Sequence, residues 1–470
     1  VWAVDSQTVD LDNQEATIVV TATDKYFRES TLTSETLELW INGVQVEKNG
    51  ATGKNLIIEK QEDIYEDWIE NGKTSKYLVG VKYTIKASGF DIDEGQVKIK
   101  IPAGTIKDYS GNQSKELEFM LYSCLKATNT ETSPTSGFLG NNSIQRQNIE
   151  SVTFVSGLSS IVSATKWDVS AGNDGSIMAW YTTNSSNGAL DVYIGGTTAI
   201  FANPDSSYLF ANIGSASKCT ATEVVKGLNL VTTKRVTNMN HMFYNTGANA
   251  MTSLDLGTNF NTESVKDMSH MFDGCGKNNM STLNLRDKFN TSKVTDMSYM
   301  FANAGEQLAT LDLSNFDTTK VTKMQYMFQN TGAKGMTSLN LGENFNTANV
   351  TDMSYMFNGT ANASSTITKI SLGKQFYTTS VTNMTSMFQN CGATHMTELD
   401  LGPAFTKIAE TNTNIFANTG NTGCIINAPE AIYQNSKNFR LNGESSTTIT
   451  YSVGTINPKY RTEWAIDSTT

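Results

Sequence analysis

VTDMSYMF, at residues 294–301, is the stretch that decides the fold, because it recurs five more times along the chain, once unchanged and four times as a variant. The other copies begin at the valines in positions 236, 265, 321, 350 and 381, so the phrase returns every 27 to 31 residues. A period of this size is typical of repeat architectures, in which each unit stacks on its neighbours. The six copies therefore predict one continuous stack over this part of the chain.

The apolar residues of the phrase predict a short helix. Val294, Met297, Met300 and Phe301 stand at i, i+3, i+6 and i+7, which places them on one face of two helical turns. A glycine follows the phenylalanine by four residues in five copies, and Ala361 replaces it in the sixth. Glycine favours the left-handed conformation that ends helices, so we expect each helix to stop there.

A second motif, Leu-x-Leu, lies between successive phrases and predicts a short strand, because its period of two puts both apolar side chains on one side. The pairs are Leu254/Leu256, Leu283/Leu285, Leu311/Leu313, Leu339/Leu341, Ile370/Leu372 and Leu399/Leu401. A unit of one strand and one helix cannot bury its apolar side alone and needs stacked neighbours. We therefore expect an α/β leucine-rich-repeat-type solenoid with a short parallel sheet and short helices.

The runs VTxMxxMF and LxL-x-x-F-(N/D)-T, with lead-in segments at 167–170, 176–181 and 192–195, resemble BspA-like leucine-rich-repeat surface proteins, including the branch with mycoplasma-type lipoprotein repeats. The resemblance covers residues of about 140 to 430. It implies a secreted or surface-anchored bacterial protein of a kind often credited with adhesion. It carries over no catalytic residue, since none is assigned in that family.

Residues 1–125 predict an all-β Ig-like sandwich. Runs at 16–23, 37–41, 77–87, 96–101 and 117–121 have the length and the Val, Ile, Thr and Tyr content of strands. Gly104–Asn112 resembles the penultimate turn of bacterial Ig-like domains. The expected fold class is thus α+β multidomain, with the sandwich followed by the repeat solenoid.

The expected boundaries follow from these motifs. They are the Ig-like module at 1–125, a linker at 126–142, a cap and lead-in at 143–230, the repeat solenoid at 231–430 and a C-terminal cap at 431–470. Trp464–Thr469 nearly repeats Trp2–Gln7, which favours the start of a following module in a tandem array. A chance match of six residues is the alternative.

Composition excludes several function classes. A net charge of −11 without a clustered basic face argues against nucleic-acid binding. No run of 18 apolar residues is present that would span a membrane. None of the HExxH, GxSxG or P-loop patterns occurs, so we expect no enzyme. Cys275 and Cys391 share one slot four repeats apart, roughly 19 Å at about 4.8 Å per rung, too far for a disulfide.

One candidate binding surface is the slot two residues before each repeat phenylalanine. Its occupants are His241, His270, Tyr299, Tyr326 and Tyr355, with Ser386 in the last copy. On a helix this slot points away from the Val, Met and Phe face, so stacking would give an exposed aromatic ladder suited to protein or sugar recognition. The alternative is a mutually packed ladder that only stiffens the stack.

A second candidate surface is formed by the outward strand positions, which would line up on the sheet face. They are Asp255, Asn284, Asp312, Asn340, Ser371 and Asp400. A plain solvated face is the alternative. Neighbouring Asp and Asn there, like Asp10/Asp12 and Asp91/Asp93/Glu94 in the first module, give only a weak signal for Ca²⁺, because the ligand spacing of a dedicated loop is missing.

The methionine pairs also allow two interpretations. Sixteen of the 18 methionines lie in the repeats, and clustered thioethers can bind Cu(I). Because each pair shares a face with Val and Phe, packing in the core is the favoured interpretation, and no cofactor is expected.

The expected function is a non-catalytic bacterial adhesin or display module, extracellular and at the cell surface. Its partner would be a protein or glycan on host or neighbouring cells, with tandem or homotypic assembly possible. The alternative is a structural stalk or filament segment of a tandem-module surface protein.

Overall fold

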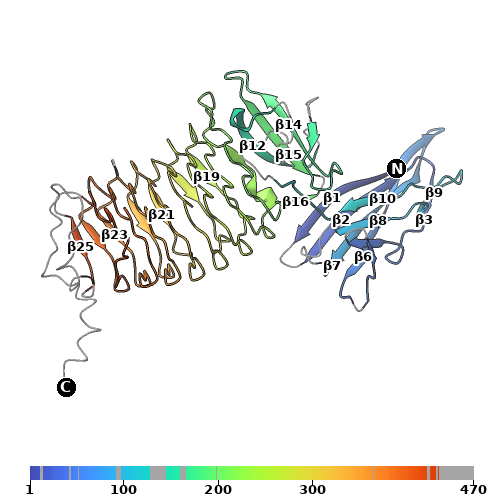
Figure 1. Ribbon diagram of the computed structural model, residues 1–470. Coiled ribbons are helices and arrows are strands. Elements are labelled where there is room, and N and C mark those ends of the chain that lie inside the picture. Colours follow the sequence, from blue (N-terminus) through green and yellow to red (C-terminus); the bar gives the residue numbers. More distant parts are fainter. Residues whose placement is uncertain are drawn as a thin grey trace.

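The computed structural model describes residues 1–10, 14–41, 44–50, 52–90, 97–127, 144–158, 166–196, 198–362, 364–420, 424–429 and 432. Figure 1 shows the two parts of the molecule, a β-module at the N-terminal end and a long stack of repeats. Most of the expected linker at 126–142 and of the C-terminal segment at 431–470 lies outside the described residues, as do Asp12, Asp91, Asp93 and Glu94.

The first module contains two four-stranded antiparallel sheets. One has the order β1 (Trp2–Asp10), β2 (Glu15–Thr23), β7 (Lys73–Ser88), β6 (Asn55–Glu70), and the other has the order β10 (Leu117–Met120), β8 (Val97–Ile101), β4 (Glu38–Ile41), β5 (Val44–Val46). A separate pair joins β3 (Phe27–Ser30) to β9 (Ile106–Asp108). The five predicted strand runs all fall on strands of these sheets.

Alternation explains why this part folds as β-structure. In β2 every second residue is buried, from Ala16 through Ile18 and Val20 to Ala22. The same alternation in β7 and β8 faces one shared apolar core that includes Tyr83 and residues of both sheets. A period of two is what a strand with one buried face requires.

A short strand joins the first module to the rest of the chain. β11 (Tyr122–Cys124) pairs in parallel with β16 (Ala199–Phe201), which in turn pairs with β18 (Val231–Thr232). The rings of Tyr122 and Phe201 lie 4.6 Å apart, and both belong to the core of the first module. Beside this junction lies a sheet in the order β13 (Lys166–Asp168), β14 (Ile177–Thr183), β15 (Leu190–Gly196), β12 (Ile149–Ser156), β17 (Val225–Lys226).

The Leu-x-Leu motifs form strands, as predicted. They are β19 (Ser253–Asp255), β20 (Thr282–Asn284), β21 (Thr310–Asp312), β22 (Ser338–Asn340), β23 (Lys369–Ser371) and β24 (Glu398–Asp400), followed by β25 (Ile425–Asn427). Equivalent residues of neighbouring repeats pair in parallel within β19–β20, β21–β22 and β23–β24–β25. The sheet side of the stack is therefore a series of small sheets.

The expected α+β class with short helices is wrong, because the repeat phrases form turns. Among the described residues the elements are strands and two short 3-10 helices, η2 (Arg146–Asn148) and η3 (Leu228–Leu230). In the first copy the N–H groups of Met239, His241 and Phe243 donate to carbonyl oxygens of the next repeat at 2.9, 3.0 and 2.9 Å. The N–H of Met242, between them, closes a turn on Met239 O at 3.1 Å. The described chain is thus nearly all β, and the short helices expected for the α/β solenoid are replaced by turns.

The backbone conformation of the aromatic slot explains why no helix forms. The slot residue has a positive φ in all six copies, from 52° at Ser386 to 60° at Tyr326. An α-helix of L-residues excludes this conformation, whereas turns with a left-handed residue contain it. Spacing at i, i+3, i+6 and i+7 fits such turns as well as a helix. The predicted left-handed glycines are confirmed, and Ala361 takes the same conformation at φ 52°.

The predicted burial of the repeat side chains is confirmed. The twelve paired methionines are at most 1% exposed, and the phenylalanines that end the phrases are fully buried. These phenylalanines stack in one column from Phe210 to Phe416, with neighbouring ring centroids 5.1 to 5.9 Å apart. One apolar cluster consequently runs through the whole stack, from Leu125 to Ile432.

Candidate functional site

The aromatic slot residues form one continuous stack of rings along the turn side of the repeats. Ring centroids lie 4.2 Å apart for His241 and His270, 4.3 Å for His270 and Tyr299, 4.4 Å for Tyr299 and Tyr326, and 4.6 Å for Tyr326 and Tyr355. Neighbouring ring planes are tilted by no more than 10°. The sequence prediction that these five side chains come together is therefore confirmed.

Sequence reasoning missed one member of this row. Tyr208 stacks on His241 with centroids 4.6 Å apart, and it too has a positive φ of 59°. Tyr208 stands two residues before Phe210 in the incomplete copy at the start of the array. The same spacing rule that identified the other rings would have found it. We call the six rings from Tyr208 to Tyr355 the ring row.

The members of the ring row are half-buried, with their faces covered by one another. The backbone N–H of each slot residue bonds to the next repeat, as that of Tyr326 does to Ser354 O at 2.9 Å. Ring edges and polar atoms are what remain for contact with solvent. In the last copy Ser386, only 3% exposed, ends the row.

Burial also changes the ionisation of the row. It lowers the pKa of His241 to about 4, with a further contribution from the neighbouring His270. The Nδ1 atom of His270 lies 2.9 Å from the Oδ2 atom of Asp273. Burial raises the pKa of Tyr299 to about 12, helped by Tyr326. At neutral pH the rings of His241 and Tyr299, which both stack on His270, are therefore uncharged.

The outward strand residues line up as predicted, but their side chains bond within the stack, either to their own turn or to the neighbouring rung. Asp255 forms an ion pair with Arg286, and Asn340 Nδ2 donates to Asp312 Oδ1 at 2.9 Å. The side chain of Asn284 accepts a hydrogen bond from the backbone N–H of Arg286 at 3.2 Å. Contacts within the stack therefore occupy part of the hydrogen-bonding capacity of these side chains.

Asp400 departs from the expectation for the strand row. It is only 5% exposed, and its Oδ1 accepts the N–H of Gly402 at 3.1 Å. Its strand, β24, has strand neighbours on both sides, β23 and β25, whereas β19 to β22 pair on one side only. Asp400 therefore does not belong to an exposed surface.

The cysteines of the repeats are free thiols. All five cysteines are free, so Cys275 and Cys391 are unpaired with each other, as expected. Burial raises the pKa of the Cys275 thiol far above its usual range. No cluster of three or more His, Cys, Asp or Glu side chains suited to a metal ion occurs in the described part of the chain.

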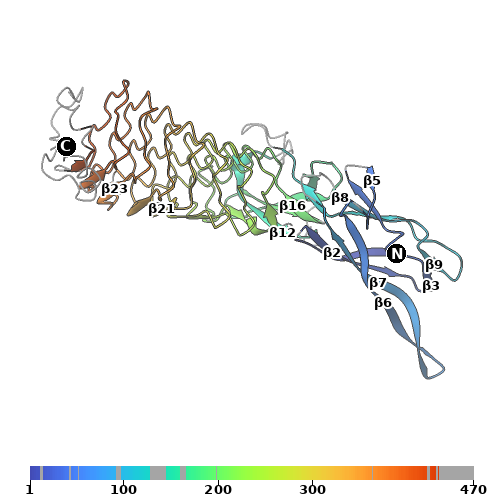
Figure 2. The same cartoon turned by 90° about the horizontal axis from the view of Figure 1, so that it is seen from below.

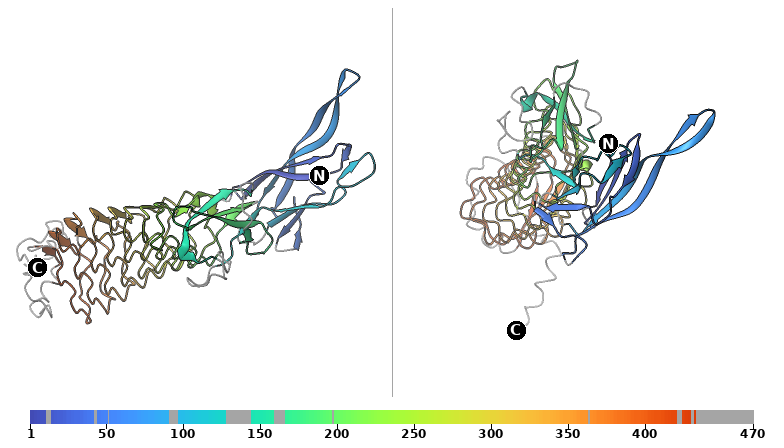
Figure 3. Two further views of the ribbon diagram at one scale, coloured as in Figure 1. Left: turned by 90° about the horizontal axis from the view of Figure 1, so that it is seen from above. Right: turned by 90° about the vertical axis from the view of Figure 1, so that its right-hand side faces the viewer.

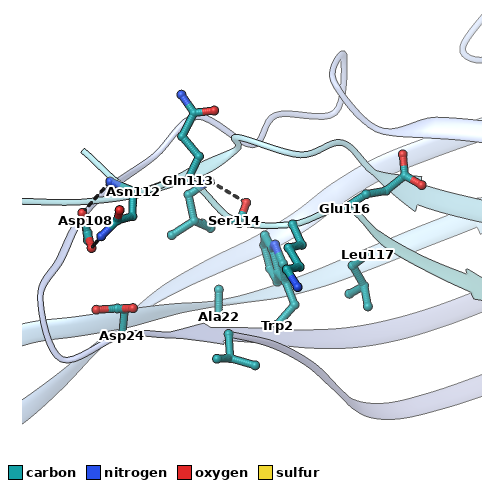
Figure 4. A pocket seen from close by; sticks show the side chains of 12 residues that line it. Trp2, Ala22, Asp24, Asp108, Asn112, Gln113, Ser114, Glu116 and Leu117 are labelled. Carbon is teal, nitrogen blue, oxygen red and sulfur yellow. Dashed lines mark hydrogen bonds between the residues drawn. The ribbon is translucent and has the colours of Figure 1, made fainter. Parts of the chain in front are cut away.

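A pocket of about 470 Å³ lies in the first module, between the start of β1 and the segment that leads from β9 into β10. Figure 4 shows Trp2 in the middle of the lining, with Asp24 and Asn112 on one side of it and Glu116 and Leu117 on the other. The Nε1 atom of Trp2 is buried and has no hydrogen-bond partner among the described residues. Sequence reasoning did not single out this pocket, because its residues come from segments far apart in the chain.

Local hydrogen bonds hold two of the lining carboxylates in place. Asn112 Nδ2 donates to Asp108 Oδ2 at 2.7 Å, and this bond is the main cause that lowers the pKa of Asp108. Asp24 Oδ1 accepts the backbone N–H of Tyr26 at 2.9 Å. The carboxylates of Asp108 and Asp24 thus stabilise the turns in which they lie.

Comparison with known proteins gives one similarity. A family described as "Mycoplasma protein of unknown function, DUF285" matches residues 215–337 and, overlapping these, residues 309–422. The matched region is the array of repeats, which is less than half of the 470-residue chain. Neither a curated protein nor a solved structure matches the chain. The repeats are therefore similar to a mycoplasma repeat family.

The described residues include no helix with the length and hydropathy needed to cross a lipid bilayer.

Proposed function

We propose that this chain is a non-catalytic part of a bacterial surface protein, and that it displays its repeats outside the cell to bind a protein or glycan on host or neighbouring cells. The proposal draws on the resemblance of the repeat phrases to BspA-like leucine-rich-repeat surface proteins. The similarity of residues 215–422 to a mycoplasma family is compatible with it. The two-sheet first module and its Gly104–Asn112 turn fit a bacterial Ig-like domain that spaces the repeats.

The observation that supports binding best is the ring row. It places one aromatic or imidazole edge per rung in a line, at intervals of 4.2 to 4.6 Å. Aromatic side chains with a polar tip are favoured at recognition surfaces because they offer contact area at a low entropic cost. A row of this kind suits an extended partner that contacts several rungs at once.

A second function is favoured by the same rings. Their faces are used in stacking, and the strand row is cross-linked by contacts such as Asn340 to Asp312. Both features stiffen the stack without any partner. The second candidate is therefore a structural spacer in a stalk or filament.

The test compares binding by the intact chain with binding by two triple variants. The chain would be screened against matrix proteins, glycans and bacterial cells. The first variant, Tyr299→Asn, Tyr326→Asn and Tyr355→Asn, removes three rings while asparagine tolerates the left-handed conformation. We expect its binding to weaken by at least about tenfold, because hot-spot aromatic residues contribute about 2 kcal/mol or more each.

The matched control changes Ser253→Ala, Thr310→Ala and Ser338→Ala on the strand side. Binding should stay within about twofold, since this variant leaves the ring row intact. If the unaltered chain binds none of the probes, the spacer function replaces adhesion. If the asparagine variant binds as well as the unaltered chain, the ring row is not the binding surface.

A further inference from the structure

The strands β6 and β7 extend beyond the first module as a two-stranded arm. Figures 2 and 3 show this hairpin projecting away from the sandwich. From Glu59 to Tyr77 none of its residues is buried, and only Ile64 and Trp68 are half-buried. We call residues 59–77 the arm. Its tip is the dipeptide Asn71-Gly72, with φ of 53° and 75°, the favoured sequence of a tight hairpin turn.

The arm has one strand edge that the described residues leave uncovered. β6 is the last strand in the order β1-β2-β7-β6, and β7 is its only strand neighbour in the part of the chain that the structure describes. Near its base this edge is covered, since the N–H of Leu56 donates to Asn49 Oδ1 at 2.9 Å and that of Ile58 to Ser34 Oγ at 2.8 Å. From Glu59 to Glu70 the described backbone hydrogen bonds go to β7 alone. Alternate N–H and C=O groups there therefore point outward.

The side chains of this edge are predominantly negative. β6 carries six carboxylates and one lysine within the arm, at Glu59, Glu62, Asp63, Glu66, Asp67, Glu70 and Lys60. Glu59 pairs with Lys86 at 2.6 Å and Glu62 with Lys60 at 2.8 Å. The other four carboxylates form no ion pair among the described residues.

The pairing of β6 with β7 shows which kind of strand matches the charges of β6. β7 places Lys76 directly opposite Asp67, and Lys73 opposite Glu70. Opposite charges on facing strand positions stabilise a pair, and like charges destabilise it. A second copy of β6 on the outer edge would bring carboxylates against carboxylates, whereas a lysine- or arginine-rich strand would match.

Exposed apolar side chains accompany the charges. Ile69 is 77% exposed and Tyr65 54%, while Trp68 packs on Tyr77 with ring centroids 4.9 Å apart. Carboxylates and the register shift of β6 between Ile58 and Lys60 protect an edge against self-pairing, but that protection does not account for exposed Ile and Tyr side chains. Apolar side chains between charges are typical of a surface that another chain covers.

We propose that the outer edge of β6, from Glu59 to Glu70, accepts an extended, lysine- or arginine-rich segment of a partner protein as an added β-strand. Main-chain hydrogen bonds would supply the affinity. The four carboxylates without an ion pair would select a segment with basic side chains. Tyr65 and Ile69 would pack against alternate side chains of the bound segment. This inference is independent of the ring row, which lies on the repeats.

The test uses the whole chain and three synthetic peptides of roughly twelve residues, which is about the length of the edge. In the first peptide lysine alternates with valine or threonine; in the second, glutamate replaces lysine. The third keeps the lysines but has proline at every third position, which prevents a hydrogen-bonded ladder. We expect the first peptide to bind at least tenfold more tightly than either of the others, and to slow amide hydrogen exchange in β6.

Charge reversal then locates the binding. Glu66→Lys, Asp67→Lys and Glu70→Lys together should weaken binding of the first peptide by at least tenfold. The matched control, Glu223→Lys, Asp287→Lys and Glu343→Lys, makes the same charge change on exposed residues outside the first module and should leave binding within twofold. Circular dichroism would establish that both variants keep the fold of the unaltered chain.

Three results would overturn the proposal. One is equal binding of the proline peptide, which would mean charge attraction without an added strand. Another is unchanged binding by the arm variant. The third is self-association of the chain in light scattering that the arm variant abolishes, because the edge would then belong to a second copy.

Discussion

Replacing Gly276 by alanine is expected to open the repeat around it, because that position is both left-handed and crowded. Gly276 has a φ of 54°, and a Cβ atom built on it would lie 2.3 Å from Cβ and 3.0 Å from Cγ of Met280. Ala361 holds the same slot in another repeat, where the residue four positions later is Ser365 rather than methionine. Alanine is thus accepted where the methionine is missing.

Two costs and one gain set the expected magnitude for Gly276→Ala. The left-handed conformation costs alanine about 1–2 kcal/mol, and overpacking a core adds about 1–3 kcal/mol. Alanine also lowers the conformational entropy of the unfolded chain, which stabilises the folded variant by about 0.4–1 kcal/mol and offsets part of these costs. The net loss in the free energy of unfolding is therefore roughly 1.5–4 kcal/mol. The reverse change, Ala361→Gly, should alter the free energy of unfolding by no more than about 1 kcal/mol. Glycine relieves the strain of the left-handed conformation, but it also raises the conformational entropy of the unfolded chain, and these two contributions oppose each other.

The thiol of Cys275 provides a local assay. It is fully buried and adjacent to Gly276, so a thiol reagent reaches it only when this repeat opens. The expected loss raises its labelling rate roughly ten- to a thousandfold, since 1.36 kcal/mol corresponds to a factor of ten. Cys391, buried in the same slot of a distant repeat, is the internal reference in peptide-resolved mass spectrometry.

The reasoning would be refuted by labelling of Cys275 in the Gly276→Ala variant at the rate of the unaltered chain. An equally large effect of Ala361→Gly would refute it too, because that change adds no atom to the core.

Three further outcomes follow from the same structure. Met300→Ala removes a fully buried side chain, so it should cost about 2–5 kcal/mol and lower the melting temperature measured by circular dichroism. Asn330→Val forces a β-branched residue into φ 55° and should cost about 1–2 kcal/mol in urea unfolding, whereas Asn330→Gly should be milder because Gly359 occupies that slot in the next repeat. The pKa of His241 is about 4 in the folded chain and 6.5 ordinarily, so the unfolded chain binds this proton more readily and stability falls as pH drops from 6.5 towards 4. After allowance for the exposure of the half-buried ring, the loss is about 1 kcal/mol, and melting temperatures of His241→Tyr should lack this part of the pH dependence.

The sequence by itself determined which side chains are buried and which come together. The period of the phrase placed Met297 and Phe301 in the core, and the pairing of strands such as β21 and β22 followed from Leu-x-Leu. The slot rule brought the ring row together, because identical positions in stacked repeats must lie beside one another. These features depend only on the spacing of the repeats and on which side chains are apolar, and both can be read directly from the sequence.

Only the tertiary structure decided the backbone between those positions. The spacing of Val294, Met297 and Met300 fits a helix and a chain of turns equally well, and hydrogen bonds to the next repeat selected the turns. A left-handed residue such as Tyr299 shows no preference for that conformation by its type, so the neighbouring rungs impose it. The burial of Asp400 and the open edge of β6 likewise depend on which strands become neighbours. Such contacts join residues far apart in the chain, where local sequence patterns carry no information.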